Sequence, residues 1–247
     1  MSLTARIRSR LEDTIIWALI ERVQFPLNES IYKPGAIPLP EASISFMDWY
    51  LREQEKLQSR IRRYDSPDEY PFFPDAVEEP ILERLSYPPI LHPCSRAVNI
   101  NFKIKEFYTN KFLPAVCPDF GRPDRGAQAE NYGSAATCDI ASLQALSRRI
   151  HFGMFVAESK FQAEEDKFTA MIRAGDREAI GNAITKPEVE KQVLARLKTK
   201  AEAHGRDLSN ESYLPKIDVN AVVNMYKEFV IPLTKEVEVE YLMQRLS

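Results

Sequence analysis

Two cations in the middle of the chain, Arg149 and Lys160, are spaced so that both could bind one anionic ligand. They lie eleven residues apart in a run of helical periodicity, and eleven residues turn an α-helix through three turns and about 20°. Both side chains therefore project from one face, where two positive charges would suit a dianion. The spacing fits equally an alternative in which they extend to solvent or pair with acidic groups on neighbouring helices.

Three further residues have the chemistry to line such a pocket. Thr234 and Glu238 lie four residues apart in the run TKEVEVEYL and so share a helix face, while Glu190 follows Pro187 near the start of another predicted helix. A hydroxyl and two carboxylates would orient the polar groups of a bound anion. Most glutamates on helices are solvated, so the sequence leaves that second interpretation open.

A second candidate site combines a helix N-terminus with an arginine pair. Asn131, Gly133 and Ser134 precede the long helical run, and the amides of a helix N-terminus favour a carboxylate. Arg62 and Arg63, at the end of another helical run, could lie across from them. The alternatives are an ordinary capped loop and an arginine pair that only complements a helix dipole.

Composition and charge exclude several classes of function. The 247 residues include 33 Lys and Arg against 36 Asp and Glu, a net charge of −3 without a basic block, which disfavours nucleic-acid and membrane-surface partners. The three cysteines and three histidines lack the spacing of metal ligands or of a catalytic triad, so no metal site is predicted. The cysteine pattern, the lack of a signal-peptide cleavage site and the lack of a long apolar run predict a cytoplasmic protein.

The apolar residues recur at helical spacing, and no alternating strand of convincing length is present. The sequence therefore predicts an all-α fold of about ten to twelve helices, with residues 1–247 as a single domain. Seventeen prolines against eight glycines separate the helical runs. Helices are expected over residues 11–24, 43–63, 101–113, 168–174, 177–184, 187–205 and 218–246, with a short one at 81–85.

The longest predicted helix covers residues 136–165. This run holds no proline and a single glycine, and its apolar positions repeat for about eight turns, so it should cross the whole molecule. Asp218 is expected to cap the last helix, and Pro232 within that helix is expected to kink it.

Three long runs resemble the fungal and plant type of chorismate mutase. They are SRIRRYDSPDEYPFFPD at 59–75, NYGSAATCDIASLQALSRRIHFGMFVAESKFQ at 131–162 and YKEFVIPLTKEVEVEYLMQRL at 226–246. The resemblance implies a homodimer of all-helical subunits that rearranges chorismate to prephenate in phenylalanine and tyrosine biosynthesis, without a cofactor. This pericyclic reaction needs no nucleophile and no proton transfer, so a protein accelerates it by holding a reactive conformer and stabilising developing charge.

The resemblance also implies a role for each pocket residue. Arg149 looks like the partner of one substrate carboxylate, and Lys160 is similar to the lysine that donates to the ether oxygen. Thr234 corresponds to a threonine near a carboxylate, and Glu190 to the carboxylate that fixes the substrate hydroxyl. Glu238 matches a glutamate beside the ether oxygen that must be protonated to donate, a state that a desolvated site would favour by raising its pKa.

Two positions depart from the family pattern. Where the family has an arginine on the first helix this chain has Ala5, and the nearby Arg8 is the tentative substitute. Where the family has an asparagine four residues before Glu190 this chain has Lys186, a tentative substrate-binding residue with added charge and length. These departures leave open an alternative function, that of a catalytically impaired family member that binds aromatic amino acids or another subunit.

The family is allosteric, with tyrosine as inhibitor and, in many fungal members, tryptophan as activator at a site between subunits. Arg62 and Arg63 resemble residues on one side of that site. Four residues resemble the opposite wall, namely Asn131, Gly133, Ser134 and Thr137. The resemblance therefore implies that tyrosine and tryptophan bind where the arginine pair meets the helix N-terminus.

Overall fold

The computed structural model describes residues 3–40, 43–119, 126–206 and 216–247. Within these ranges the regular elements are helices and single helical turns, and no strand is present, which confirms the all-α prediction. No helix in the described ranges is long and apolar enough to cross a membrane. Eleven α-helical segments, α1 to α11, are found in this part of the chain.

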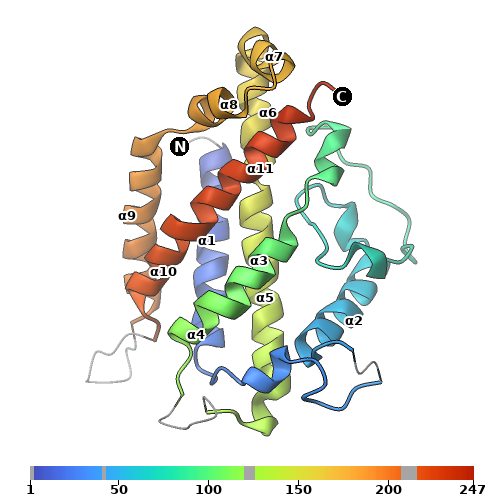
Figure 1. Cartoon of the computed structure of the whole chain (residues 1–247), viewed down its shortest axis with the longest axis vertical. Helices are drawn as coiled ribbons and strands as arrows, with labels where there is room; N and C mark the ends of the chain where they lie inside the picture. The colour runs from blue at the N-terminus through green and yellow to red at the C-terminus, as the bar shows by residue number, and fades with distance from the viewer. Residues whose placement is uncertain (1–2, 41–42, 120–125, 207–215) are drawn as a thin grey trace.

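The axis of the molecule is the rod formed by α5 (Tyr132–His151) and α6 (Gly153–Ala163), which runs through the centre of Figure 1. Phe152 separates the two helices but keeps right-handed helical angles, and its amide donates to the Arg148 carbonyl at 2.9 Å. At about 1.5 Å per residue the rod is about 48 Å long. It is the long helix that the sequence predicts.

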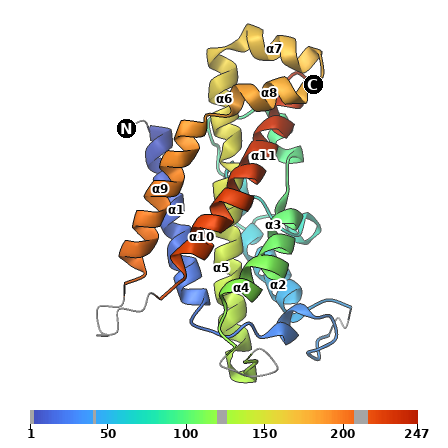
Figure 2. The same cartoon turned by 60° about the vertical axis from the view of Figure 1, so that its left-hand side comes forward.

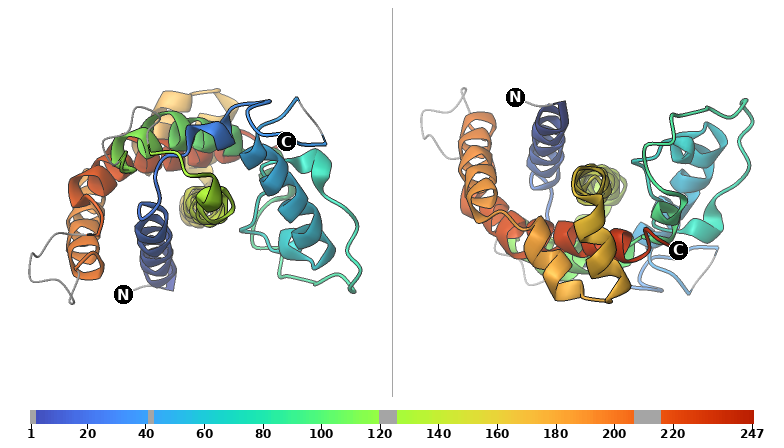
Figure 3. Two further views of the ribbon diagram at one scale, coloured as in Figure 1. Left: turned by 90° about the horizontal axis from the view of Figure 1, so that it is seen from below. Right: turned by 90° about the horizontal axis from the view of Figure 1, so that it is seen from above.

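The other helices pack around this rod in an arc. α1 (Leu3–Arg22) lies along α5, and α9 (Pro187–His204) lies beside α1 and α10 (Val219–Met225). α3 (Asn101–Phe107) contacts α5, and α11 (Ile231–Met243) crosses both α5 and α6 (Figure 2). Seen end-on, α9 and α2 (Phe46–Arg60) form the two ends of the arc and α5 lies within its curve (Figure 3).

Two short helices, α7 (Glu165–Arg173) and α8 (Arg177–Ile184), reverse the chain after α6 and lead it back to α9. Asp176 caps α8, because its carboxylate accepts the Ala179 amide at 2.8 Å. Asp218 caps α10 in the same way, as predicted, by accepting the Asn220 amide at 2.8 Å. These local bonds fix where α8 and α10 begin.

Both prolines inside helical segments follow a π-helical turn. The turn Tyr108–Phe112 joins α3 to α4 (Leu113–Val116), which contains Pro114, and the turn Tyr226–Val230 joins α10 to α11, which contains Pro232. Proline has no amide hydrogen, and the wider turn accommodates the missing bond. The disturbance predicted at Pro232 therefore takes the form of a π turn.

The short helix predicted at 81–85 is wrong, because residues 77–92 are extended and irregular. Several of their amides bond to other parts of the chain. The Ile81 amide donates to the Arg60 carbonyl at 2.9 Å, and the Leu85 amide donates to the Asp65 carboxylate at 3.2 Å. With Pro80, Pro88 and Pro89 in the same stretch, a helix would lose more bonds than it gains.

A fully buried charge cluster joins α1 to α5. Arg22 donates from Nε to Asp139 at 2.5 Å and from Nη2 to the Tyr32 hydroxyl at 3.0 Å. Its other donors bond to the backbone carbonyls of Phe25, Pro26 and Leu27 at 3.2, 3.1 and 3.1 Å. All five guanidinium N–H groups thus have an acceptor. Burial would lower the pKa of Arg22, but Asp139 and its neighbours raise it well above the usual value, so the cation persists.

Candidate active site

A cavity of about 250 Å³ opens between α5, α6, α9, α11 and the end of α8. It brings together the five residues predicted to line an anion pocket and also Lys186, although they come from segments up to 89 residues apart in sequence. The lining residues are Arg149, Val156, Lys160, Ile184, Lys186, Val189, Glu190, Val193, Ile231, Thr234, Lys235 and Glu238. Arg149 and Lys160 share one side of the rod, as their spacing predicts.

Arg149 is the deepest cation of the cavity. Its side chain is only 4% exposed, and its guanidinium makes no hydrogen bond or ion pair with the described residues; Nε in particular is buried without an acceptor. The nearby Tyr226 hydroxyl is also buried without a partner, and burial raises the pKa of Tyr226 more than the Arg149 charge lowers it. A buried cation without an anion is costly, so this position favours a ligand carboxylate.

Lys160 and Glu238 face each other across the cavity. The distance from Lys160 Nζ to Glu238 Oε2 is 3.9 Å, and Lys160 Nζ also donates to the Ile184 carbonyl at 2.6 Å. The Glu238 side chain is 10% exposed. An ammonium and a carboxyl at this separation can both donate to one ligand oxygen when the carboxyl is protonated.

Thr234 lies one turn before Glu238 on α11. Its hydroxyl donates to the Val230 carbonyl at 2.6 Å, so the oxygen lone pairs remain the polar group that it offers the cavity. The side chains of Thr234 and Glu238 also lie against Gly153, where a Cβ would come within 3.0 Å of Thr234 Cγ2 and 3.1 Å of Glu238 Cγ. A side chain at this position would have to push α11 away by a few tenths of an ångström, so glycine allows the close contact between α6 and α11.

The mouth of the cavity holds Glu190, Lys235 and Lys186. Glu190 pairs with Lys235 at 2.7 Å. Lys186 is the N-cap residue of α9, and its side chain makes no hydrogen bond or ion pair with the described residues. With Arg149 and Lys160, the cavity has four cations against two carboxylates, an excess that suits a dianionic ligand.

The two remaining sequence-based expectations for this pocket have different outcomes. Arg8 lies on α1, but its side chain is outside the described part of the structure. No group of three or more His, Cys, Asp or Glu that could hold a metal is found among the described residues.

The two walls of the predicted effector site lie at opposite ends of the contact between α2 and α5. Thr137 Oγ1 lies 3.2 Å from the Tyr50 hydroxyl near the start of α2. Arg63, beyond the end of α2, pairs at 2.9 Å with Glu69, which also pairs with Arg148 of α5 at 3.2 Å. Thr137 and Arg148 are about 16 Å apart along α5, so a single chain does not bring the two walls together.

The helix N-terminus at this site begins earlier than expected. α5 starts at Tyr132, so Gly133 and Ser134 belong to its first turn and do not precede it. Asn131 is the N-cap residue but makes no side-chain bond to the helix; its Nδ2 donates to Gln128 at 2.6 Å. The prediction that Gly133 and Ser134 precede the helix is therefore wrong, while both remain exposed at the helix start.

Arg62 is fixed by the extended segment 77–92. Its Nη1 donates to the Glu83 carbonyl at 2.7 Å, and its backbone has the left-handed angle φ of 71°. Its Nε is buried and has no acceptor among the described residues. Like Arg149, Arg62 retains a donor that the chain does not use.

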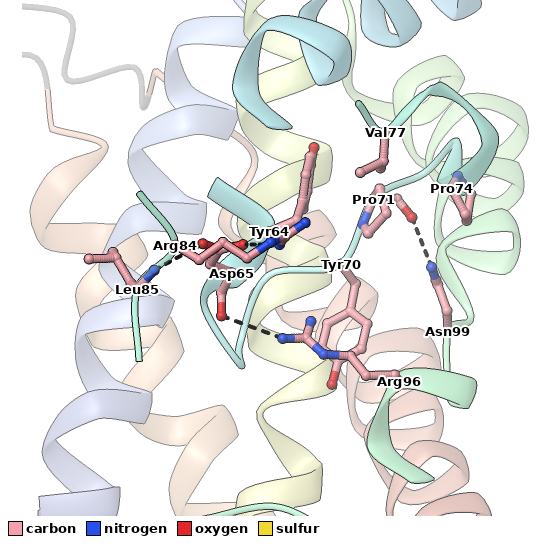
Figure 4. A pocket seen from close by; sticks show the side chains of 10 residues that line it. All are labelled: Tyr64, Asp65, Tyr70, Pro71, Pro74, Val77, Arg84, Leu85, Arg96 and Asn99. Atoms are coloured by element: carbon pink, nitrogen blue, oxygen red, sulfur yellow. Dashed lines mark hydrogen bonds and ion pairs between the residues drawn. The ribbon is translucent and has the colours of Figure 1, made fainter. Parts of the chain in front are cut away.

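A larger cavity of about 500 Å³ lies beside the turn Arg63–Asp65 and contains none of the predicted catalytic residues (Figure 4). Its polar groups are engaged with each other: Arg84 pairs with Asp65 at 2.9 Å, and Asn99 donates to the Pro71 carbonyl at 2.8 Å. Size alone therefore does not make this cavity the better candidate for binding a dianion.

Sequence reasoning missed the apolar lining, Lys235 and the role of Gly153. Lys235 adjoins Thr234, but adjacent helical residues normally face different ways, so its pairing with Glu190 was not foreseeable. The single glycine in the long helical run was the available signal for a close helix contact.

Comparison with known proteins points to one family. A family model described as chorismate mutase type II matches residues 131–239. A chorismate mutase of Trichoderma parareesei is 65% identical over 240 residues, which cover 96% of this chain and 90% of that protein.

Solved structures agree with the sequence relatives. The Aro7p chorismate mutase of Candida albicans in complex with L-Trp has a TM-score of 0.93 at 42% identity, over 98% of this chain and 90% of that chain. The structure of AtCM1 with tyrosine bound in its allosteric site has a TM-score of 0.87 at 38% identity, over 98% and 95% of the two chains.

Proposed function

The chain belongs to the chorismate mutase family, and we propose that it rearranges chorismate to prephenate in the cavity between α5, α6, α9 and α11. The observation that carries this proposal is Arg149, a buried guanidinium without a protein anion, beside the Lys160–Glu238 pair. Chorismate has two carboxylates and an ether oxygen. The cavity offers a cation for the former and two donors for the latter.

The reaction breaks the ether C–O bond as a C–C bond forms, and negative charge develops on the ether oxygen. Lys160 donates to that oxygen, and Glu238 donates as a protonated carboxyl from the other side. Arg149 binds a carboxylate and holds the reactive conformer. The Thr234 hydroxyl donates to a substrate carboxylate once its proton turns from the Val230 carbonyl. Glu190 accepts from the substrate hydroxyl.

Lys186 is the second cation available for the substrate. It lines the cavity mouth, and although the charge of Glu164 is close enough to feel it, no described residue forms an ion pair or side-chain hydrogen bond with it. It binds the second carboxylate or the hydroxyl of the substrate. Its side chain is longer than that of the family's asparagine and carries a charge, which tightens binding of a dianion. Arg8 remains a weaker candidate for the same task, on sequence grounds alone.

The first experiment follows the loss of chorismate absorbance with the purified protein, alone and with tyrosine or tryptophan. Turnover supports the proposal. A folded protein that binds tyrosine or tryptophan but shows no turnover overturns it and favours the alternative, a binding protein of this family. A Lys186→Asn variant made in parallel shows whether this position determines KM, with the exposed Lys191→Asn on the same helix as control.

Regulation by effectors follows from the arrangement of the two walls. The relatives with bound L-Trp and with tyrosine in an allosteric site make these amino acids the candidate effectors, tyrosine as inhibitor and tryptophan as activator. Arg62 and Arg63 of one copy meet Asn131, Gly133, Ser134 and Thr137 of a second copy across a two-fold axis. Rates that do not respond to either amino acid at saturation would contradict this.

The protein acts as a homodimer of single-domain subunits. Large apolar side chains at the end of α2 and in the segment 77–92 are exposed, a surface that a second copy would cover. They are Leu57, Ile61, Ile81, Leu82 and Leu85, each between 45% and 66% exposed. Sedimentation of the parent protein and of Ile61→Lys tests this: the parent should be a dimer and the variant a monomer.

The location is the cytoplasm. This proposal rests on the sequence, in which the three cysteines are odd in number and widely spaced, as is typical of a reducing compartment. Fractionation of cells that express the full-length protein tests this location.

A further inference from the structure

Lys160 and Glu238 belong to two different helices, so their separation depends on how α6 and α11 pack. The distance of 3.9 Å between Lys160 Nζ and Glu238 Oε2 is not fixed by any covalent neighbour. A small rotation or slide of α11 against α6 would change it. The structure must therefore hold the two helices in one relative position.

One end of the contact is fixed by Gly153, at the start of α6. Because a Cβ there would lie 3.0 Å from Thr234 Cγ2 and 3.1 Å from the Thr234 carbonyl, the backbone of α6 rests directly on α11. Backbone contact of this kind defines how close the helices come, but it does not prevent them from sliding.

The other end is fixed by a buried carboxylate, Glu158. Its oxygens accept from the Tyr241 hydroxyl at 2.5 Å, from Arg245 Nε and Nη2 at 2.8 and 3.1 Å, and from Gln162 at 3.0 Å. We call Glu158, Tyr241, Arg245 and Gln162 the Glu158 cluster. Glu158 and Gln162 are on α6, Tyr241 is on α11 and Arg245 follows it, so the cluster bonds one helix to the other.

The centre of the cluster is buried, and its carboxylate is ionised, while Arg245 and Gln162 lie nearer the surface. Glu158 is 3% exposed and Tyr241 is 0% exposed. Burial would raise the pKa of Glu158, but the bonds from Arg245, Tyr241 and Gln162 lower it overall. The Tyr241 hydroxyl also accepts the His92 amide at 3.0 Å, so both its donor and an acceptor position are used.

The cluster does not touch the cavity. None of its members lines it, and Glu158 precedes Lys160 by two residues, which turns it about 200° away around α6. Tyr241 follows Glu238 by three residues on α11. Each half of the cluster is thus less than one turn from the catalytic group on its own helix.

We propose that the Glu158 cluster is a positioning device that sets the separation of Lys160 and Glu238 and thereby kcat. Gly153 sets how closely α6 and α11 approach each other. The bonds of Tyr241 and Arg245 to Glu158 prevent α11 from sliding along α6. This inference rests on the proposed function and adds residues that act through Lys160 and Glu238.

Two variants weaken the cluster with little change of shape. Glu158→Gln keeps the side chain's size but removes the charge that binds Arg245, and Tyr241→Phe keeps the buried ring but removes its hydroxyl. Each should lower kcat by about tenfold to a hundredfold, because a displacement of about 1 Å at the reacting groups has that effect, with KM changed by less than about threefold.

Glu240→Gln is the matched control. It is the same chemical change as Glu158→Gln, made on α11 two residues from Glu238. It breaks the ion pair of Glu240 with Arg177 on α8. Its kcat should stay within about twofold of the parent. If all three variants have the same kcat, the positioning role is wrong.

The pH dependence of kcat separates positioning from stability. Besides Lys160, the charged groups that line the cavity with Glu238 are Arg149 of α5, Lys186, Glu190 of α9 and Lys235 of α11. When Lys160 moves away, the ionised form of Glu238 loses its nearest cation, so the alkaline limb of kcat should shift to higher pH in Glu158→Gln. An unshifted limb together with a reduced kcat would mean that the cluster only stabilises the fold.

A readout without turnover distinguishes failure of this inference from failure of the proposed function. The Glu238 carboxyl carbon, assigned in labelled protein by its loss in Glu238→Gln, can be titrated by NMR in the parent, Glu158→Gln and Glu240→Gln. A midpoint that moves up only in Glu158→Gln supports the positioning role, even if the parent shows no turnover. Equal midpoints in all three proteins would overturn it.

Discussion

Arg22 and Arg149 are both buried arginines on neighbouring helices, and the protein surrounds them in opposite ways. Arg22 is 0% exposed, and each of its five N–H groups has an acceptor within the chain. Arg149 is 4% exposed and makes no hydrogen bond or ion pair with the described residues. The first charge is neutralised by the fold, and the second has no acceptor in the described part of the chain and is available to a ligand.

The difference distinguishes a charge that is paired within the fold, at Arg22, from a charge that is available to bind a ligand, at Arg149. An ion pair that satisfies all its donors gains little net stability over apolar packing, but removing one partner exposes the full desolvation cost of the other. A buried cation without an anion lowers stability until a ligand binds. We therefore expect substitutions at the Arg22 cluster to affect unfolding and substitutions at Arg149 to affect catalysis.

The largest effect is expected for Arg149→Ala. Loss of the carboxylate partner should lower kcat/KM by about 10³-fold or more, at least about 4 kcal/mol, because the substrate carboxylate would enter a desolvated site without a cation. The unfolding free energy should stay constant or rise. Chorismate turnover and urea unfolding of the same preparation check both parts, and a large loss of stability would contradict the comparison.

Arg22→Met should have the opposite profile. It leaves Asp139 buried without its cation and should cost about 3 kcal/mol of unfolding free energy, while kcat/KM of the folded fraction stays within about twofold. The double variant Arg22→Met, Asp139→Leu should recover part of this loss. Urea titrations of the single and double variants measure the coupling, and a double variant less stable than Arg22→Met would refute it.

His151 extends the comparison to a third buried group, two residues after Arg149. Its ring stacks on Tyr70 with centroids 4.4 Å apart, its Nδ1 donates to the Ser147 carbonyl at 2.9 Å, and its Nε2 accepts the Ile100 amide at 3.3 Å. Burial lowers its pKa to about 4. Like Arg22, it is satisfied by the fold, so it should matter for stability.

The sign of this effect follows from the lowered pKa. Below about pH 6.5 the unfolded chain binds a proton that the folded chain takes up only near pH 4. The unfolding free energy therefore decreases as the pH is lowered through that window. The part due to His151 should be about 2 kcal/mol between pH 7 and pH 5. Urea unfolding at both pH values should show a smaller difference for His151→Gln than for the parent. Equal differences would exclude His151 as the cause.

The smallest effect is expected for Glu238→Gln, and it concerns the shape of the pH profile. If Glu238 donates as a protonated carboxyl, kcat of the parent falls by about tenfold per pH unit once that carboxyl ionises. Glutamine donates at every pH, so the variant's alkaline limb should be flat. A limb that survives unchanged in Glu238→Gln would assign the titration to another group.

Several features of this protein follow from local sequence alone. Helix geometry makes the relation between residues eleven apart predictable, so Arg149 and Lys160 were placed on one face without knowledge of the fold. The same holds for Thr234 with Glu238, and for Asp218 as a cap, because caps and faces depend on a few neighbouring residues.

Other features arose only when distant segments met. A buried charge such as Glu158 needs a partner, but nothing in local spacing identifies Arg245, 87 residues away, as that partner. The helix predicted at 81–85 failed because Arg60 and Asp65 take its amides. The cavity itself exists because α11 crosses α6 at Gly153 and α9 folds back beside them. Helix faces are local properties, whereas pairing and cavities depend on packing between elements, which only the tertiary structure decides.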